Sequence, residues 1–184
     1  MPKGKTHENL LLKFIPFVLV IFFFIGVNLP IRLDIYGLLV INAYLIGGYF
    51  FSPDLDIDSS VYRRWGIFRW IWLPYKNLIS HRSKLSHGIL IGTIIRILYF
   101  FILISIIFMT LIYISIGELP IEQYLLKTIN YTIINKYYFL SILLAFELSA
   151  DVHIFSDRIY SFVKKMKRVF ILNKKGKKVR YYKK

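Results

Sequence analysis

The chain has 184 residues, of which 57% are hydrophobic and 19% are charged, whereas about a quarter of the residues in a typical soluble domain are charged. An aromatic content of 18% argues against disorder, and the absence of cysteine excludes disulfides and thiolate metal sites. The net charge of +15 arises mainly near the end of the chain, because residues 158–184 contain 12 basic and no acidic side chains. These features predict a membrane protein with a basic tail.

Four apolar stretches approach the roughly 20 residues that a helix needs to cross a bilayer core about 30 Å thick. They are residues 11–29, 35–51, 88–116 and 137–155. The fourth stretch is the weakest because Glu147, Asp151 and His153 interrupt it, and a soluble amphipathic helix is the alternative there. The predicted fold is therefore all-α, a polytopic membrane protein with about four transmembrane helices.

The distribution of lysine and arginine predicts how these helices are oriented. The N-terminus carries Lys3 and Lys5, residues 52–87 carry six basic side chains and the tail carries twelve, against three in the two opposite segments. Because basic residues favour the cytoplasmic side, we expect a multi-pass protein of the cell membrane with both termini in the cytoplasm. The tail predicts contact with an anionic lipid bilayer, worth about 1 kcal/mol per basic residue near the surface. Nucleic acid is a less favoured partner for the same charges.

All four histidines lie near the predicted cytoplasmic ends of the spans, together with several carboxylates. Imidazole and carboxylate groups bind zinc, manganese and similar ions where thiolates are missing, although each such residue alone is also an ordinary interfacial side chain. The candidate ligands are His7, Asp54, Asp56, His81, His87, His153 and Asp157. His153 and Asp157 are four residues apart, which places them on one face of a helix. We expect one or two divalent ions, with zinc or manganese favoured.

The motifs resemble those of a known family. They are the strings at residues 4–7, 52–57, 64–66, 69–75, 81–83, 85–88, 147–148, 153 and 156–157. Together they are similar to uncharacterised bacterial membrane proteins described as metal-binding and, more distantly, to LexA-regulated membrane-bound proteins predicted to be metal-dependent hydrolases. The resemblance implies metal binding, a multi-span fold and, less directly, hydrolysis. Asp151 departs from the pattern, and is either an extra ligand or a charge facing the lipid headgroups.

Two functions fit these observations. The first is a metal-dependent hydrolase that acts at the cytoplasmic membrane face on a phosphoester or lipid-like substrate, with Asp56 as general base and Arg82 neutralising a substrate oxygen. Arg82 is equally well explained as a basic anchor at the membrane. The alternative function is a non-catalytic metal-binding membrane protein that senses, stores or anchors. Residues 1–157 would form the metal-binding membrane domain and residues 158–184 a basic cytoplasmic helix or tail.

Two charges fall inside the predicted spans. Arg96 follows His87 by 9 residues and Glu147 precedes Asp157 by 10 residues, which corresponds to roughly 13.5 and 15 Å at 1.5 Å per residue. Ionisable groups inside a membrane usually pair with one another. We therefore expect an ion pair between Arg96 and Glu147, which fixes helix registry or, alternatively, lets Glu147 also support a ligand.

Overall fold

The computed structural model describes residues 4–81, 83–117 and 121–174, and within these ranges it contains helices and no strands. The long helices are α1 (Gly4–Val27), α2 (Leu33–Phe50), α6 (Ile91–Ile116) and α8 (Lys136–Lys174). Short elements join α2 to α6, namely η1 (Pro53–Asp56), α3 (Ser60–Arg64), η2 (Gly66–Trp72), α4 (Leu73–Leu78) and α5 (Lys84–His87). Helix α7 (Ile121–Ile134) joins α6 to α8. The predicted all-α class is confirmed.

Within the described ranges, four helical segments are long and apolar enough to cross a membrane, judged by length and composition. They are Thr6–Val27, Leu33–Asp56, Ile91–Ile116 and Lys136–Phe170. Each overlaps one predicted stretch, but α8 continues well beyond residue 155 into the basic segment without a break. Helix α7 was not predicted, and it is exposed along its whole length.

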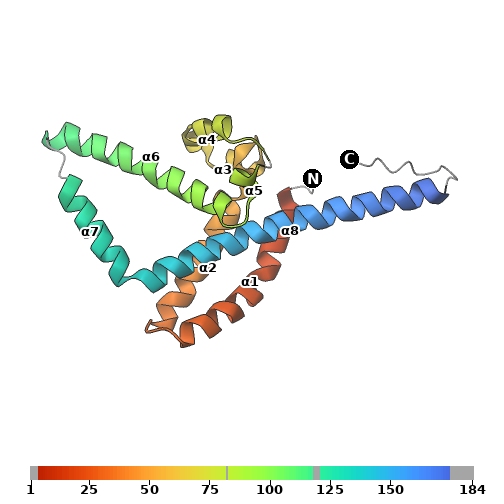
Figure 1. Cartoon of the computed structure of the whole chain (residues 1–184), viewed down its shortest axis with the longest axis horizontal. Coiled ribbons are helices and arrows are strands. Elements are labelled where there is room, and N and C mark those ends of the chain that lie inside the picture. The colour runs from red at the N-terminus through yellow and green to blue at the C-terminus, as the bar shows by residue number, and fades with distance from the viewer. Residues whose placement is uncertain (1–3, 82, 118–120, 175–184) are drawn as a thin grey trace.

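The first core lies where the α1–α2 hairpin packs against α8 (Figure 1). Its buried members are Leu11, Val18, Phe22, Tyr36, Val40, Ala43, Tyr44 and Ala145. Gly47 allows the close approach of α2 to α8, because a Cβ atom at this position would lie 2.4 Å from Ser149 Oγ and 3.1 Å from the Phe146 backbone. This packing brings the start of α1, the end of α2 and the middle of α8 to one place.

A second, aromatic core fixes the short elements against the beginning of α6. Trp72 is fully buried and its indole stacks on Phe100 of α6, with ring centroids 5.9 Å apart and planes 8° apart. Phe51, at the end of α2, makes edge contacts with both of these rings. Beyond this contact α6 diverges from α8, and α7 connects their far ends (Figure 1). The second core therefore holds η1, through Leu55, against the beginning of α6, and α5 packs beside α6 and η1.

The structure does not form the predicted ion pair between Arg96 and Glu147. Both side chains are buried. Arg96 donates to the Ser86 carbonyl oxygen at 2.6 Å and to Thr93 Oγ1 at 3.0 Å, whereas Glu147 accepts from the Leu90 backbone N–H at 2.7 Å. The prediction rested on depth along each helix, which leaves open the direction in which a side chain leaves the helix axis.

Candidate metal centre

The seven candidate ligands come from four parts of the chain that the fold brings together. They are His7 at the start of α1, Asp54 and Asp56 on η1, His81 and His87 before and at the end of α5, and His153 and Asp157 on α8. Their ligand atoms form three overlapping groups, in each of which the atoms lie within 4.8 Å of one another. His153 belongs to two groups and His87 to two, so the three groups form one continuous cluster.

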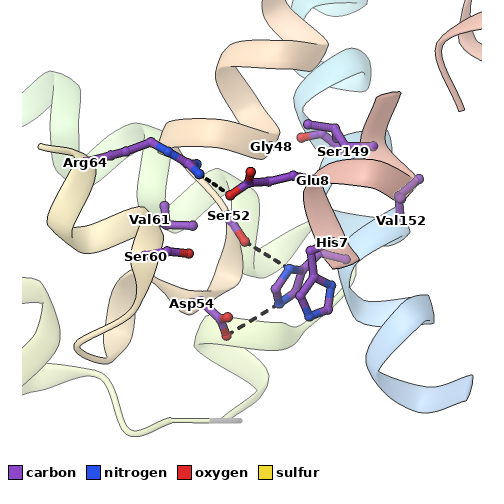
Figure 2. Close-up of a pocket in the computed structure, with 12 residues that line it drawn as sticks. His7, Glu8, Gly48, Ser52, Asp54, Ser60, Val61, Arg64, Ser149 and Val152 are labelled. Carbon is purple, nitrogen blue, oxygen red and sulfur yellow. Dashed lines mark hydrogen bonds and ion pairs between the residues drawn. The ribbon is translucent and has the colours of Figure 1, made fainter. Parts of the chain in front are cut away.

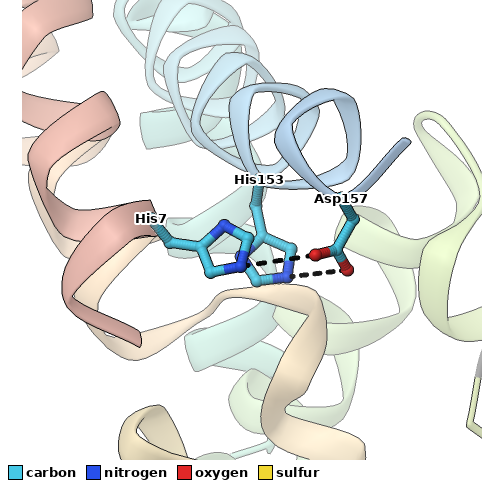
Figure 3. A group of neighbouring side chains, drawn as sticks. All are labelled: His7, His153 and Asp157. Atoms are coloured by element: carbon cyan, nitrogen blue, oxygen red, sulfur yellow. Dashed lines mark ion pairs between the residues drawn. The ribbon is translucent and has the colours of Figure 1, made fainter. Parts of the chain in front are cut away.

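The first group contains His7, His153 and Asp157. The two imidazole rings stack with centroids 4.1 Å apart, and both face the Asp157 carboxylate (Figure 3). His7 Nε2 lies 3.4 Å from Asp157 Oδ1, and His153 Nε2 lies 3.9 Å from Asp157 Oδ2. The spacing of four residues between His153 and Asp157 thus places both on the face of α8 that meets the start of α1.

The other two groups extend the cluster toward α5. Asp54, His87 and His153 form the second group, in which His153 Nε2 lies 3.4 Å from Asp54 Oδ1. Asp54 enters this space from η1, on the side opposite the start of α1 (Figure 2). Asp56, His81 and His87 form the third group.

Four buried atoms of the cluster have no hydrogen-bond partner among the described residues, which leave out Arg82; they are Asp54 Oδ1, His87 Nε2, His153 Nε2 and Asp157 Oδ1. Buried polar atoms are nearly always paired in proteins. Nitrogen–oxygen separations of 3.4 to 3.9 Å within the cluster are close to the separation of two ligands on one tetrahedral ion, which is roughly 3.3–3.6 Å for bonds of 2.0–2.2 Å. The unpaired atoms therefore fit a divalent metal ion.

Three serine hydroxyls hold the other ring nitrogens. Ser156 Oγ lies 2.6 Å from His7 Nδ1, Ser52 Oγ lies 3.2 Å from His153 Nδ1, and Ser86 Oγ lies 3.0 Å from His87 Nδ1. A hydrogen bond at Nδ1 orients the ring and leaves Nε2 available, as in many metal-binding histidines. The sequence motifs contain these serines, but sequence reasoning gave them no role, because serine occurs at many other positions of the chain.

Asp56 occupies a more enclosed position than the other carboxylates. Its side chain has no exposed surface. Asp56 Oδ1 lies 2.9 Å from His81 Nδ1, while Oδ2 accepts a hydrogen bond from the Ser86 hydroxyl. Because both carboxylate oxygens are engaged, Asp56 is better suited to orient His81 than to act as a free general base. Arg82, the other predicted catalytic residue, lies outside the described residues.

The protonation of His87 also suits metal binding. Burial lowers the pKa of the His87 imidazole below its ordinary value of 6.5, and the nearby Asp56 carboxylate opposes this shift. A lowered pKa favours the neutral ring at neutral pH, which is the form that binds metal.

An ion pair between Glu8 and Arg64 flanks the cluster (Figure 2). Arg64 also donates to the Tyr49 carbonyl oxygen at 3.0 Å. These contacts tie the start of α1 to α3 and to the end of α2, beside His7. Arg64 begins the motif at residues 64–66, but the sequence did not predict its pairing with Glu8.

Comparisons with known proteins agree with this chemistry. The model of a family described as uncharacterized metal-binding protein (DUF2227) matches residues 2–167. An uncharacterized protein of Aquifex aeolicus (strain VF5) is 34% identical over 58 residues, a segment that covers 31% of this chain and 40% of that protein. The chain thus aligns with less than half the length of this relative. No solved structure matches the chain.

Proposed function

Since the chain belongs to this family of uncharacterized metal-binding proteins, we propose that it is an integral membrane protein that holds a divalent metal ion at one end of its helices. The unpaired buried atoms of Asp54, His87, His153 and Asp157 carry this proposal. His7 completes the ligand set on α1, and His81 extends it on the far side of His87. The sharing of His87 and His153 between groups leaves room for two ions, with zinc or manganese favoured by the nitrogen and oxygen donors.

The membrane assignment rests on the helices themselves. Four of them have sufficient length and hydropathy, and many of their large apolar side chains point outward, including Phe24, Leu38 and Ile114, which are 65–73% exposed. Such a surface suits lipid hydrocarbon. We place both termini and the metal centre on the cytoplasmic side, and the basic end of α8 against anionic lipid.

A hydrolytic reaction is the activity that we propose for this centre, because open space lies next to the candidate metal ligands. A cavity of about 600 Å³ opens beside His87 and Asp157 and is also lined by Arg158, so a substrate with an anionic group has space next to the candidate ligands. A bound divalent ion would supply Lewis acidity and an activated water there. Asp56 and Ser86 would hold the His81 and His87 rings in place. The alternative is a metal-binding protein without turnover.

The test begins with the metal content of purified full-length protein, measured by plasma mass spectrometry in detergent. We expect at least one zinc or manganese ion per chain in the wild type, and a marked loss in His153→Ala. Lys136→Ala, at the far end of α8, is the control. Absence of metal after reconstitution with zinc and manganese would refute the proposed centre.

Turnover separates the two functions. Metal-loaded protein would be assayed with bis-p-nitrophenyl phosphate and with phosphatidic acid. Hydrolysis that disappears in His153→Ala supports the enzyme. Full metal loading with no hydrolysis of either compound would favour the non-catalytic alternative.

A further inference from the structure

Helices α1 and α8 enclose an apolar groove of about 870 Å³. Leu10, Phe14 and Phe17 line it from α1, and Leu148 and Ile159 line it from α8. The lining residues of α1 extend from Thr6 to Ile21, which corresponds to about 22 Å at 1.5 Å per residue. One leaflet of a bilayer contributes about half of a 30 Å hydrocarbon core. The groove is therefore long enough for an extended acyl chain of one leaflet.

The groove leads to the candidate metal centre. It shares Ile89, Ile154 and Arg158 with the cavity beside His87 and Asp157, which we name the headgroup cavity. An apolar surface and a set of candidate metal ligands are thus connected through one basic side chain. This arrangement matches a molecule with an apolar chain at one end and an anionic group at the other.

The charged residues of the two cavities indicate where the anionic group of a bound molecule would lie. Arg158 is exposed and forms no ion pair within 4.0 Å among the described residues, and it directly follows the candidate ligand Asp157 in α8. Asp151, the acidic residue of the groove lining, lies two helical turns earlier, on the side of the apolar chain. Ser83 and Ser161 add two hydroxyls to the headgroup cavity. The anionic group is therefore placed at Arg158 and not deeper in the groove.

We propose that the groove and the headgroup cavity bind a single phospholipid, with one acyl chain between α1 and α8 and its phosphate at Arg158. The proposal rests on the proposed function, because it places the phosphoester of that lipid next to the candidate metal ligands. It makes a membrane phospholipid the substrate class, in contrast to a water-soluble phosphoester.

The experiment measures binding of fluorescent dioleoyl phosphatidic acid to full-length protein in detergent by fluorescence polarisation. Arg158→Gln should weaken binding about tenfold, as expected for the loss of one charge-assisted hydrogen bond. Arg168→Gln, on the same helix but outside both cavities, should change it less than twofold. Leu10→Trp fills the groove and should weaken binding about fivefold or more, whereas Leu12→Trp, on the outer side of α1, should not.

Competition with unlabelled compounds shows which parts of the lipid the protein recognises. Unlabelled phosphatidic acid should displace the probe, while dioleoylglycerol and inorganic phosphate should do so at least tenfold less well. Equal effects of Arg158→Gln and Arg168→Gln, or of Leu10→Trp and Leu12→Trp, would overturn the proposal, as would equal displacement by dioleoylglycerol. Metal content is measured on the same preparations, so that lipid binding by metal-free protein is distinguished from failure of the metal centre.

Discussion

Arg96 and Glu147 bind the two ends of the turn between α5 and α6, where Arg96 donates to the Ser86 carbonyl oxygen at 2.6 Å and Glu147 accepts from the Leu90 N–H at 2.7 Å. Leu90 has a φ of 62°, in the left-handed region that non-glycine residues rarely adopt. His87 lies between the two anchored residues. Each buried charge therefore positions a candidate ligand through the backbone, and neither needs the other for this.

The first prediction follows from these separate contacts. Arg96→Leu leaves the buried Ser86 carbonyl without this donor, and Glu147→Leu leaves the Leu90 N–H unpaired. Each change should lower the free energy of unfolding by about 1–3 kcal/mol, measured by thermal unfolding in detergent. Glu147→Gln keeps an acceptor oxygen and should cost less. The double Leu variant should be no more stable than either single variant. Recovery of stability in the double variant would show that the two charges interact directly.

The second prediction compares two histidines. His153 belongs to two of the three ligand groups, whereas His81 belongs to one and lies at the edge of the cluster. His153→Ala should therefore reduce zinc affinity and stoichiometry more than His81→Ala, as measured by calorimetric titration of metal-free protein. Equal losses in the two variants would contradict the shared role of His153.

The third prediction concerns the serine that holds His7. Ser156→Ala removes the hydroxyl at His7 Nδ1, and should weaken metal binding about 10- to 100-fold, because such partners fix the orientation of the ligand ring. Ser141→Ala is a matched control, since Ser141 is also buried on α8 but its hydroxyl donates to the Tyr137 carbonyl oxygen and, among the described residues, contacts none of the candidate ligands. The same metal titration in both variants tests this, and an equal effect of the two changes would argue against the role of Ser156.

The helical class predicted from the sequence is confirmed, and the side chains proposed as ligands lie close together in the structure, while their role as metal ligands stays a prediction. The sequence did not predict which side chains contact them. Length and hydropathy suffice to locate α1, α2 and α6, because a membrane span requires a long apolar run. Helix α7 has no such run, since Glu122 and Lys127 interrupt it, and it was missed for this reason.

Direction around a helix axis was the information that the sequence lacked. The spacing of His153 and Asp157 fixes their relative direction because both are on α8. Arg96 and Glu147 are on different helices, so their depths say nothing about whether they face each other. The roles of Ser52, Ser86 and Ser156 depend in the same way on contacts between distant segments.

The fourth prediction concerns pH. Burial lowers the pKa of His87 below 6.5 in the folded protein, so below about pH 6.5 the unfolded chain takes up a proton that folded His87 resists. The unfolded state then binds more protons, and the stability of the metal-free protein should fall as the pH decreases through that range. His87→Gln should reduce this pH dependence. Thermal unfolding between about pH 7.5 and 5.5 measures the pH dependence of stability in the wild type and in His87→Gln. If stability changed with pH equally in the two proteins, His87 would not be the source of the effect.

The fifth prediction uses two glycines. A Cβ atom at Gly92 would lie 2.5 Å from the Ser86 carbonyl oxygen, whereas a Cβ atom at Gly37 would meet nothing within 4 Å. Gly92→Ala should therefore destabilise the protein by about 1–3 kcal/mol and also weaken metal binding, because Ser86 must move. Gly37→Ala, in the helical interior of α2, should be neutral or stabilise by up to about 1 kcal/mol. Thermal unfolding and zinc titration of both variants provide the measurement, and equal stability of the two would refute the steric argument.

The unbroken course of α8 has a mechanical consequence for the cluster. Its 39 residues extend for about 58 Å at 1.5 Å per residue, and the two ligands that it carries lie near its middle. A tilt of the basic end would move His153 and Asp157 together and leave the separation between them unchanged. Their separations from His7 and Asp54, which belong to other elements, would change instead. When the basic end attaches to a charged surface, the distances from His153 and Asp157 to His7 and Asp54 would therefore change, although the attachment point lies far from these four residues.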